Sequence, residues 1–312
     1  MIHLICPNPA IDRTLLIKDF KAGVPNRPYE VKEFAGGKGF NVAYAIGFEE
    51  PNVAFCVHTI IGGRNGEFLK DLAEERKVPL KLTHIDVNTR LCNIIIDTEK
   101  LINYPIYENS FNLEESLLDQ FTNKLESSIS SGDYVVFSGS LMKGMPSDYI
   151  STFIHKFKNT DVKFIVDTSG EALVNAYQAK PYAIKINDEE VLDLVPNKTF
   201  DTIESYAELL DSDFTKDIPC FIITLGPKGI IAKINDGIFH IHAEKVNAKN
   251  PIASGDFFLG ALVKNISIAE DSLTTLKRAI SYSTANVLNW YPELHASDVE
   301  EIYNNLTVTR FK

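Results

Sequence analysis

A short stretch of the chain, Asn250–Asp256, combines a turn of small residues with a carboxylate at the point where an apolar helix begins. Ala253, Ser254 and Gly255 carry little or no side chain, so their backbone N–H groups can converge on an anion. A helix N-terminus adds positive potential and unpaired donors there. The carboxylate of Asp256 can accept the proton of an attacking hydroxyl. The segment therefore indicates charge stabilisation and a general base for phosphoryl transfer, with an ordinary helix-capping loop as the alternative.

A second glycine-rich turn also leads into an expected helix, at Ala35–Ala43, and it contains Lys38. Its glycines allow a close backbone approach, and Lys38 supplies a point charge, which suits a substrate phosphate or sugar hydroxyls. The phosphate-binding pattern GxxxxGK[ST] is absent from the chain. A third segment, Ile223–Ile230, has the pattern of a strand, a glycine turn and a second strand, and by itself it indicates a plain β-hairpin.

The composition of the chain favours an acidic cytoplasmic enzyme. Its 312 residues are 45% hydrophobic, which is enough for a large core. The net charge of -11 argues against a nucleic-acid partner, because a polyanion is held by clustered Lys and Arg. Met1–Pro7 is typical of a first β-strand, and with no basic leader or long apolar run we expect no membrane segment. The scattered cysteines have no CxxC spacing, which predicts reduced thiols and no structural zinc: Cys6, Cys56, Cys92 and Cys220.

Short apolar runs of strand length alternate with amphipathic helical patterns. The expected strands cover Ile2–Cys6, Val53–His58, Tyr134–Ser138, Phe164–Asp167, Ala183–Ile186 and Phe221–Thr224. The helical patterns cover Asn41–Phe48, Glu67–Arg76, Leu113–Ile129, Asp148–Phe157 and Ile203–Leu210. Because several runs are β-branched and apolar throughout, they predict strands buried on both faces. The alternation predicts a three-layer α/β/α fold around a mostly parallel sheet, with ligands at the carboxyl ends of its strands.

Two segments interrupt this alternation with strand-like pieces and no helix between them. They lie at about residues 13–34 and 84–107. We expect them to form a small β-sheet outside the main layers. Each returns beside a polar cluster, which favours a lid over the active site, and a surface hairpin that only caps the core is the alternative. Since the chain has no internal repeat, low-complexity run or Gly/Ser linker, it predicts a single domain over residues 1–312.

Eight short motifs, taken in their order along the chain, together resemble those of a known protein family. They are Asn8-Pro9-Ala10-Ile11-Asp12, Ala35-Gly36-Gly37-Lys38-Gly39-Phe40-Asn41, Thr89-Arg90, Ser138-Gly139-Ser140-Leu141, Asp167-Thr168-Ser169-Gly170, Lys185-Ile186-Asn187-Asp188-Glu189-Glu190, Thr224-Leu225-Gly226 and Gly255-Asp256. The chain resembles the PfkB group of ribokinase-like carbohydrate kinases over essentially its whole length, and within it the branch of 1-phosphofructokinases and tagatose-6-phosphate kinases. The resemblance implies a ribokinase-like fold with a small β-lid. The implied reaction transfers the γ-phosphoryl group of ATP to a sugar hydroxyl.

The resemblance also implies roles at the reacting centre. Asp256 would take the hydroxyl proton, while the backbone N–H groups of Ala253, Ser254 and Gly255 would hold the migrating phosphoryl oxygens. Sugar-binding groups would be Asp12, Gly37, Asn41 and Ser138.

Cations near these groups bear on the substrate. By the same resemblance, Lys38 and Arg90 would neutralise a phosphate already on the sugar. Arg27 is a further candidate, with a solvated loop charge as its alternative. A kinase of a neutral sugar has little use for converging cations. We therefore expect a ketohexose phosphate as substrate and a ketohexose bisphosphate as product.

The nucleotide site follows from the later motifs of the resemblance. Its members would be Lys185, Asn187, Thr224, Gly226, Gly229 and Asn286. Asn187 and Glu190 would organise Mg²⁺ through water beside the ATP phosphates, because one carboxylate and one amide suit a hydrated ion.

The chain departs from the family pattern at Ala253, where the family usually has glycine. If this position needs a positive φ, alanine costs about 1 kcal/mol and tilts one N–H donor. The segment Leu101–Pro105 lacks the Gly-Pro of the branch, which leaves the sugar stereochemistry open.

Other functions stay open at this point. One is a kinase of a neutral sugar or nucleoside, and another is a catalytically weak regulator that binds sugar phosphate on the same scaffold. The use of a monovalent cation and a homodimer formed through the lid are equally open. His240 and His242 alternate along a strand as metal ligands sometimes do, but the sequence offers no matching third ligand.

Overall fold

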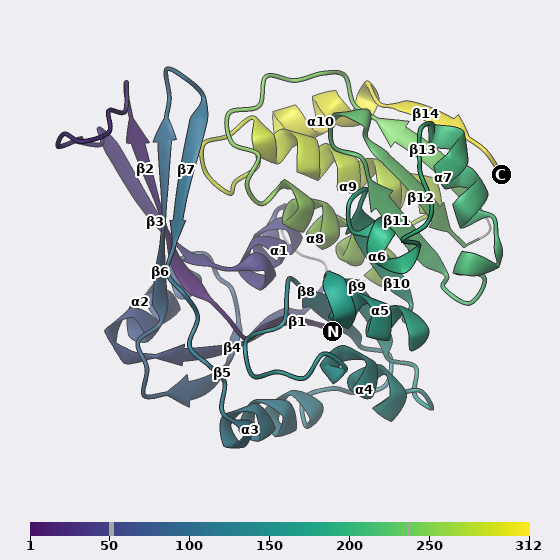
Figure 1. Cartoon of the computed structure of the whole chain (residues 1–312), viewed down its shortest axis with the longest axis horizontal. Coiled ribbons are helices and arrows are strands. Elements are labelled where there is room, and N and C mark those ends of the chain that lie inside the picture. The colour runs from purple at the N-terminus through teal and green to yellow at the C-terminus, as the bar shows by residue number, and fades with distance from the viewer. Residues whose placement is uncertain (50–52, 236) are drawn as a thin grey trace.

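The computed structural model describes residues 1–49, 53–235 and 237–312, most of them in two β-sheets and the helices around them (Figure 1). The strands are β1 Ile2–Cys6, β2 Ala10–Ile17, β3 Glu30–Gly36, β4 Phe55–Gly62, β5 Leu80–Ile85, β6 Arg90–Asp97, β7 Ile102–Tyr107, β8 Tyr134–Ser138, β9 Lys163–Asp167, β10 Ala183–Asn187, β11 Cys220–Thr224, β12 Ile230–Ile234, β13 Gly237–His242 and β14 Thr307–Arg310. The helices are α1 Lys38–Gly47, α2 Gly63–Glu75, α3 Glu115–Glu126, α4 Tyr149–Lys156, α5 Gly170–Gln178, α6 Val191–Leu194, α7 Ile203–Leu210, α8 Ser254–Ser267, α9 Ser272–Val287 and α10 Ala296–Asn304, with 3-10 turns at Asp213–Thr215 and Gly226–Lys228.

The large sheet has ten strands in the order β14-β13-β12-β11-β10-β9-β8-β1-β4-β5. Its strands from β11 to β5 are parallel, and β12, β13 and β14 extend it antiparallel. Every residue of β1 and β4 is buried, as expected for strands covered on both faces. The mostly parallel sheet predicted from the sequence is confirmed.

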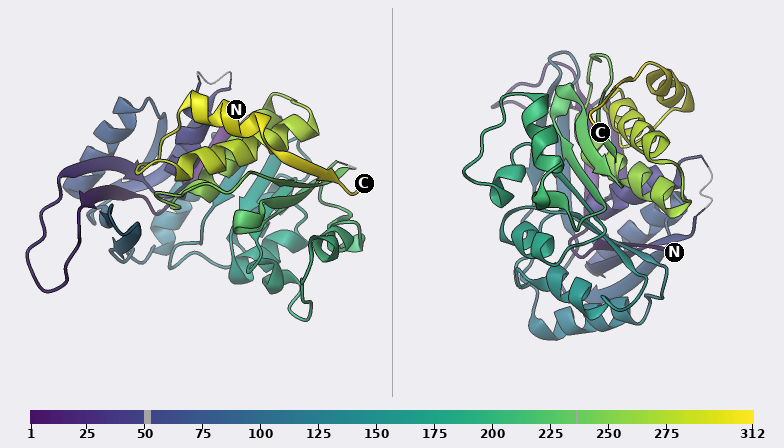
Figure 2. Two further views of the ribbon diagram at one scale, coloured as in Figure 1. Left: turned by 90° about the horizontal axis from the view of Figure 1, so that it is seen from above. Right: turned by 90° about the vertical axis from the view of Figure 1, so that its right-hand side faces the viewer.

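Helices cover both faces of this sheet, which confirms the three-layer α/β/α fold (Figure 2, right). On one face α1, α8, α9 and α10 pack against one another, and on the other face α4, α5 and α6 do so. The core between α1 and α8 is contributed largely by aliphatic residues and by three fully buried phenylalanines, Phe40, Phe257 and Phe258. None of the helices in the described ranges is long and apolar enough to span a membrane.

The small sheet has four strands in the order β3-β2-β6-β7 and stands beside the large sheet (Figure 1). Strands β2 and β6 are parallel, whereas the two outer pairs are antiparallel. The strands differ from the expected ranges at their edges. Residues 10–12 and 35–36 also belong to the small sheet, while residues 84 and 85 lie in β5 of the large sheet, where the expected lid range began.

Two helix starts position the functional groups. Helix α1 begins at Lys38, directly after Gly37, whose φ of 106° is open to glycine but costly for other residues. Helix α8 begins at Ser254 after Ala253, which has φ 70° and ψ −5° and is therefore left-handed. Both starts point toward the carboxyl edge of the large sheet, where β8, β9 and β10 also end (Figure 1).

Candidate active site

The buried carboxylate of Asp256 lies in the first turn of α8 and meets a residue of α1. The Nδ2 group of Asn41 donates to Oδ2 of Asp256 at 2.9 Å. Both side chains are buried, at 7% and 6% exposure. Burial raises the pKa of Asp256 to about 6, although the Lys38 charge and the Asn41 hydrogen bond each lower this pKa. A carboxylate held this way has the basicity that a general base near neutral pH requires.

The turn before α8 leaves two backbone donors free of protein partners in the part of the chain that the structure describes. Among the described residues, none accepts from the N–H groups of Ala253 and Gly255, and Ser254 N reaches Pro251 O only at 3.4 Å. The left-handed conformation of Ala253 meets the condition under which alanine is costly, so about 1 kcal/mol of backbone strain sits at this turn. Free donors at a helix start are suited to bind an anion.

Two lysines and a buried aspartate flank this turn. Lys185 Nζ donates to Oδ2 of Asp167 at 3.0 Å, and Lys38 Nζ lies 4.0 Å from Oδ1 of the same carboxylate. The side chain of Lys185 is only 8% exposed, whereas that of Lys38 is 49% exposed. The Asp167 charge raises the pKa of Lys38, so its ammonium is retained despite partial burial. A Cβ on Gly255 would lie 3.1 Å from Lys185 Nζ, which places this ammonium beside the free N–H groups.

Asp12 and Arg90 form a separate group at the base of the small sheet. Burial raises the pKa of Asp12 to about 7, while the nearby Arg90 charge lowers it. A Cβ on Gly36 would come within 2.1 Å of the Asp12 carboxyl carbon, so only glycine leaves room for this side chain. Arg90 donates to the carbonyl oxygens of Asn8, Pro9 and Glu108, each at 3.3 Å. These long contacts hold the guanidinium in place without using all five of its N–H groups.

Asn187 and Glu190 bind each other at the end of β10. The Oδ1 atom of Asn187 accepts from the N–H groups of Glu189 and Glu190, and Oε2 of Glu190 accepts from Asn187 N. Burial raises the pKa of Glu190. Since Asn187 Oδ1 accepts twice and Glu190 Oε2 accepts once, Glu190 Oε1 is the side-chain oxygen of this pair that the described residues leave without a hydrogen bond. This donor set fits a hydrated Mg²⁺ rather than an ion enclosed by protein.

A cavity of about 370 Å³ extends from the start of α8 along α9. Polar groups at one end come from Thr224, Ser254 and Gly255, and apolar groups farther along include Phe258 and Val287. Gly226 and Gly229 also line it, at the turn between β11 and β12. Such a cavity can hold a purine nucleotide with its phosphates at the helix start.

Of the remaining expected site residues, Ser138 lies next to this group, because it pairs in register with Asp167 on the adjacent strand. Arg27 is exposed in the loop between β2 and β3, and it makes no polar contact with the described residues. Ser138 ends β8 with a buried hydroxyl that has no partner in the described ranges, and the same is true of both amide atoms of Asn286. Asn286 is 1% exposed and is not among the residues that line the cavity. His240 Nε2 pairs with Lys228 O, and neither His240 nor His242 joins a metal-ligand group among the described residues.

Asp167 is the functional candidate that the sequence did not single out. It occurs in the motif Asp167–Gly170, but its importance depends on Lys185, which comes from the adjacent strand β10. Besides the motif, its place as the last residue of a predicted strand was an available signal, because ligands gather at the carboxyl ends of parallel strands.

A three-layer fold with a buried carboxylate, free N–H groups and lysines at the carboxyl ends of its parallel strands fits a carbohydrate kinase. The chain belongs to the pfkB family of carbohydrate kinases, whose family model matches residues 5–290. It is similar to tagatose-6-phosphate kinase from Staphylococcus epidermidis, with 27% identity over 99% of each chain.

Solved structures share the fold. Phosphofructokinase-2 from Escherichia coli in complex with substrates and products superposes with a TM-score of 0.89 at 22% identity, covering 97% of this chain and 98% of that one. The same enzyme in complex with potassium gives 0.86. A protein described as a possible 1-phosphofructokinase from Thermotoga maritima gives 0.84 at 18% identity, covering all of both chains.

Proposed function

We propose that this protein transfers the γ-phosphoryl group of ATP to a hydroxyl of a ketohexose phosphate and yields a ketohexose bisphosphate. The observation that carries the proposal is the contact of buried Asp256 with Asn41 beside free backbone donors and two lysines. The similarity of the chain to a tagatose-6-phosphate kinase, over 99% of each chain, supports a ketohexose phosphate as the substrate.

The residues divide the chemistry as follows. Asp256 takes the proton of the sugar hydroxyl, whose oxygen forms the new bond to the γ-phosphorus as the bond to the β-phosphate oxygen breaks. The N–H groups of Ala253 and Gly255 hold the oxygens of the migrating group. Lys38 and Lys185 offset its negative charge, and Asp167 orients both ammonium groups.

The nucleotide occupies the 370 Å³ cavity, with its base against the apolar part and its phosphates at the start of α8. When bound, Mg²⁺ neutralises charge on the ATP phosphates. Glu190 would hold this ion through water with Oε1, while Asn187 keeps the Glu190 carboxylate in position.

The sugar phosphate binds between the two groups of charged residues. Asp12 and Asn41 form hydrogen bonds with the hydroxyls of the sugar, and Arg90 pairs with the phosphate that the sugar already carries. The small sheet covers this site as a lid. Asn103 of β7 donates to Oδ1 of Asn250 at 3.0 Å, which joins the lid to the turn that precedes α8.

A substrate panel tests the proposal. Purified protein with MgATP is assayed for ADP with fructose 1-phosphate, fructose 6-phosphate, tagatose 6-phosphate and free fructose, once with K⁺ and once with a large organic cation. We expect turnover with at least one sugar phosphate and little with the free sugar. Preference for a free sugar or a nucleoside would favour the neutral-substrate kinase, and binding without turnover would favour the regulator.

We further propose a homodimer formed through the lid. Large apolar side chains are exposed on its two outer strands, namely Val31 on β3 and Ile106 and Tyr107 on β7. Exposed apolar surface on an open sheet favours pairing with another copy. Light scattering after size exclusion should give a dimer, and Ile106→Lys should shift it toward monomer. A monomeric wild-type chain would contradict this part.

A further inference from the structure

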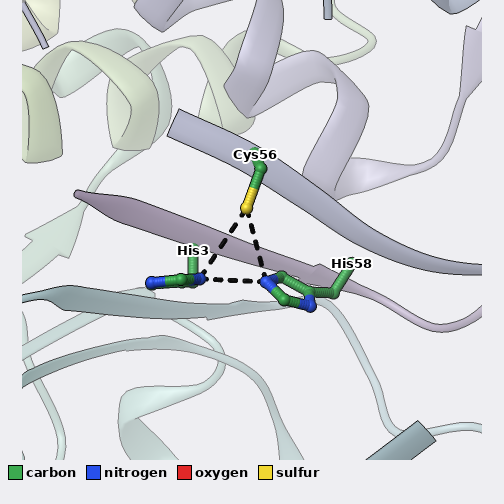
Figure 3. Close-up of side chains that lie close together, drawn as sticks. All are labelled: His3, Cys56 and His58. Atoms are coloured by element: carbon green, nitrogen blue, oxygen red, sulfur yellow. Dashed lines mark hydrogen bonds between the residues drawn. The ribbon is translucent and has the colours of Figure 1, made fainter. Parts of the chain in front are cut away.

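Three potential metal ligands converge inside the large sheet, on the strands β1 and β4 (Figure 3). His3 pairs in register with Cys56 on the adjacent parallel strand, and His58 follows two residues later on the same face. All three residues are at most 2% exposed. Because the ligands come from strands about fifty residues apart, no short motif such as CxxC shows them in the sequence.

The two nitrogen–sulfur distances match those around a metal ion, whereas the two imidazole nitrogens lie at hydrogen-bond distance. Cys56 Sγ lies 3.4 Å from His58 Nε2 and 3.7 Å from His3 Nδ1, and the two nitrogens are 2.9 Å apart. Tetrahedral zinc with bonds of about 2.0 Å to nitrogen and about 2.3 Å to sulfur separates nitrogen from sulfur by about 3.6 Å and two nitrogens by about 3.4 Å. Only the imidazole pair therefore has to open, by about half an ångström.

Asp133 fixes the orientation of one ligand. Its Oδ2 lies 3.1 Å from His3 Nε2, while Oδ1 binds the N-terminal ammonium of Met1 at 2.8 Å. A carboxylate that accepts from Nε2–H leaves the lone pair of His3 Nδ1 directed at Cys56 and His58. A histidine that ligates through one nitrogen and donates to a carboxylate through the other is a recurrent feature of protein metal sites.

We propose that His3, Cys56 and His58 bind one ion of a borderline-soft transition metal, of which Zn²⁺ is the representative. Imidazole and thiolate suit zinc and similar ions, whereas Mg²⁺ prefers oxygen. Cys56 gives its thiol proton to solvent on binding, and His58 carries its remaining proton on Nδ1. The described residues offer three ligands, so water completes the coordination. The ion links β1 to β4 near the start of β1, whereas the candidate active site lies at the carboxyl ends of the strands.

Metal titration of the intact protein tests the proposal. Chelator-stripped protein is titrated with Zn²⁺ against a chromophoric chelator, and with Co²⁺ while the near-ultraviolet thiolate-to-cobalt absorption is followed. We expect one equivalent per chain, the cobalt absorption and a higher Tm with Zn²⁺. Failure of the wild-type chain to take up either ion would overturn the proposal, whatever the result of the kinase assays.

Variants identify the ligands. Cys56→Ser should lose the cobalt absorption and bind Zn²⁺ at least tenfold more weakly, and His58→Gln should weaken binding similarly. Asp133→Asn should weaken it by about 10- to 100-fold while the absorption persists, because it acts through His3. Cys220→Ser is the matched control, since Cys220 is an equally buried free cysteine on β11. Unchanged binding in Cys56→Ser, with circular dichroism like that of the wild type, would contradict the site.

Discussion

Asn41 Nδ2 donates to Asp256 Oδ2 at 2.9 Å and so joins the start of α1 to the start of α8. The bond uses one carboxylate oxygen and leaves the other for a substrate hydroxyl. It also stabilises the charged form of an acid whose burial works in the opposite direction. The helices that follow the two glycine-rich turns of the sequence therefore meet at one buried carboxylate.

The pH dependence of kcat/KM follows from two raised carboxyl pKa values. Burial raises the pKa of Asp256 to about 6 and that of Asp12 to about 7. In the proposed mechanism both groups act as carboxylates. The value of kcat/KM should therefore fall as the pH drops through this window, and the slope of log(kcat/KM) against pH should exceed one. Asp12→Asn should reduce the slope to one. A profile that is flat from pH ~5 to ~8 would contradict the assignment of Asp256 as the base.

Backbone strain at Ala253 gives a stability prediction. Ala253 has φ 70° and Ala269, at the other end of α8, has φ 57°. Replacing either by glycine should raise the free energy of unfolding by about 1 kcal/mol, measured by urea denaturation. Because Ala253 already adopts the left-handed conformation, Ala253→Gly should change turnover by less than about twofold.

Ala269→Gly is the matched control, because Ala269 is exposed at the far end of the helix. A rise of tenfold or more in turnover for Ala253→Gly alone would mean that the alanine misdirects an N–H donor. A loss of stability in both variants would contradict the strain.

Lys38 and Arg90 should differ in kinetic effect because they lie in separate groups. Lys38 interacts with Asp167, Asp256 and Glu190, whereas Arg90 lies beside Asp12. We expect Lys38→Ala to lower kcat at least tenfold, since it removes charge from the migrating phosphoryl group. Arg90→Ala should chiefly raise the KM for the sugar phosphate. Equal effects on KM with unchanged kcat would instead assign both cations to the sugar phosphate.

The fold was predictable where a local pattern determines the element. The buried strands of the large sheet can be recognised in the sequence as apolar, often β-branched runs such as Ile2–Cys6. Strand β14 does not, because its four residues are all exposed and it exists only by pairing with β13. The parallel pairing of β2 with β6 is likewise invisible locally, since it joins strands about eighty residues apart.

For the candidate site, too, the sequence indicates groups within one short segment but not groups that come together from distant segments. The turn before Asp256 follows from one short segment, whereas the left-handed conformation of Ala253 entered only as a condition, raised by the glycine usual in the family. The grouping of Lys38 with Asp167 requires α1 and β9 to be neighbours in space. The grouping of His3, Cys56 and His58 also depends on strand order, so the spacing of the cysteines along the sequence does not show it.

Turnover of Asp256→Asn tests the central claim most directly. Asparagine keeps the size of the side chain but cannot accept the hydroxyl proton. With MgATP and the preferred sugar phosphate, we expect kcat to fall at least ~10²-fold while sugar affinity, measured by calorimetry, stays within a few-fold of the wild type. Asp271→Asn, at the N-cap of α9, should retain wild-type turnover. Wild-type kcat in Asp256→Asn would contradict its role as the general base.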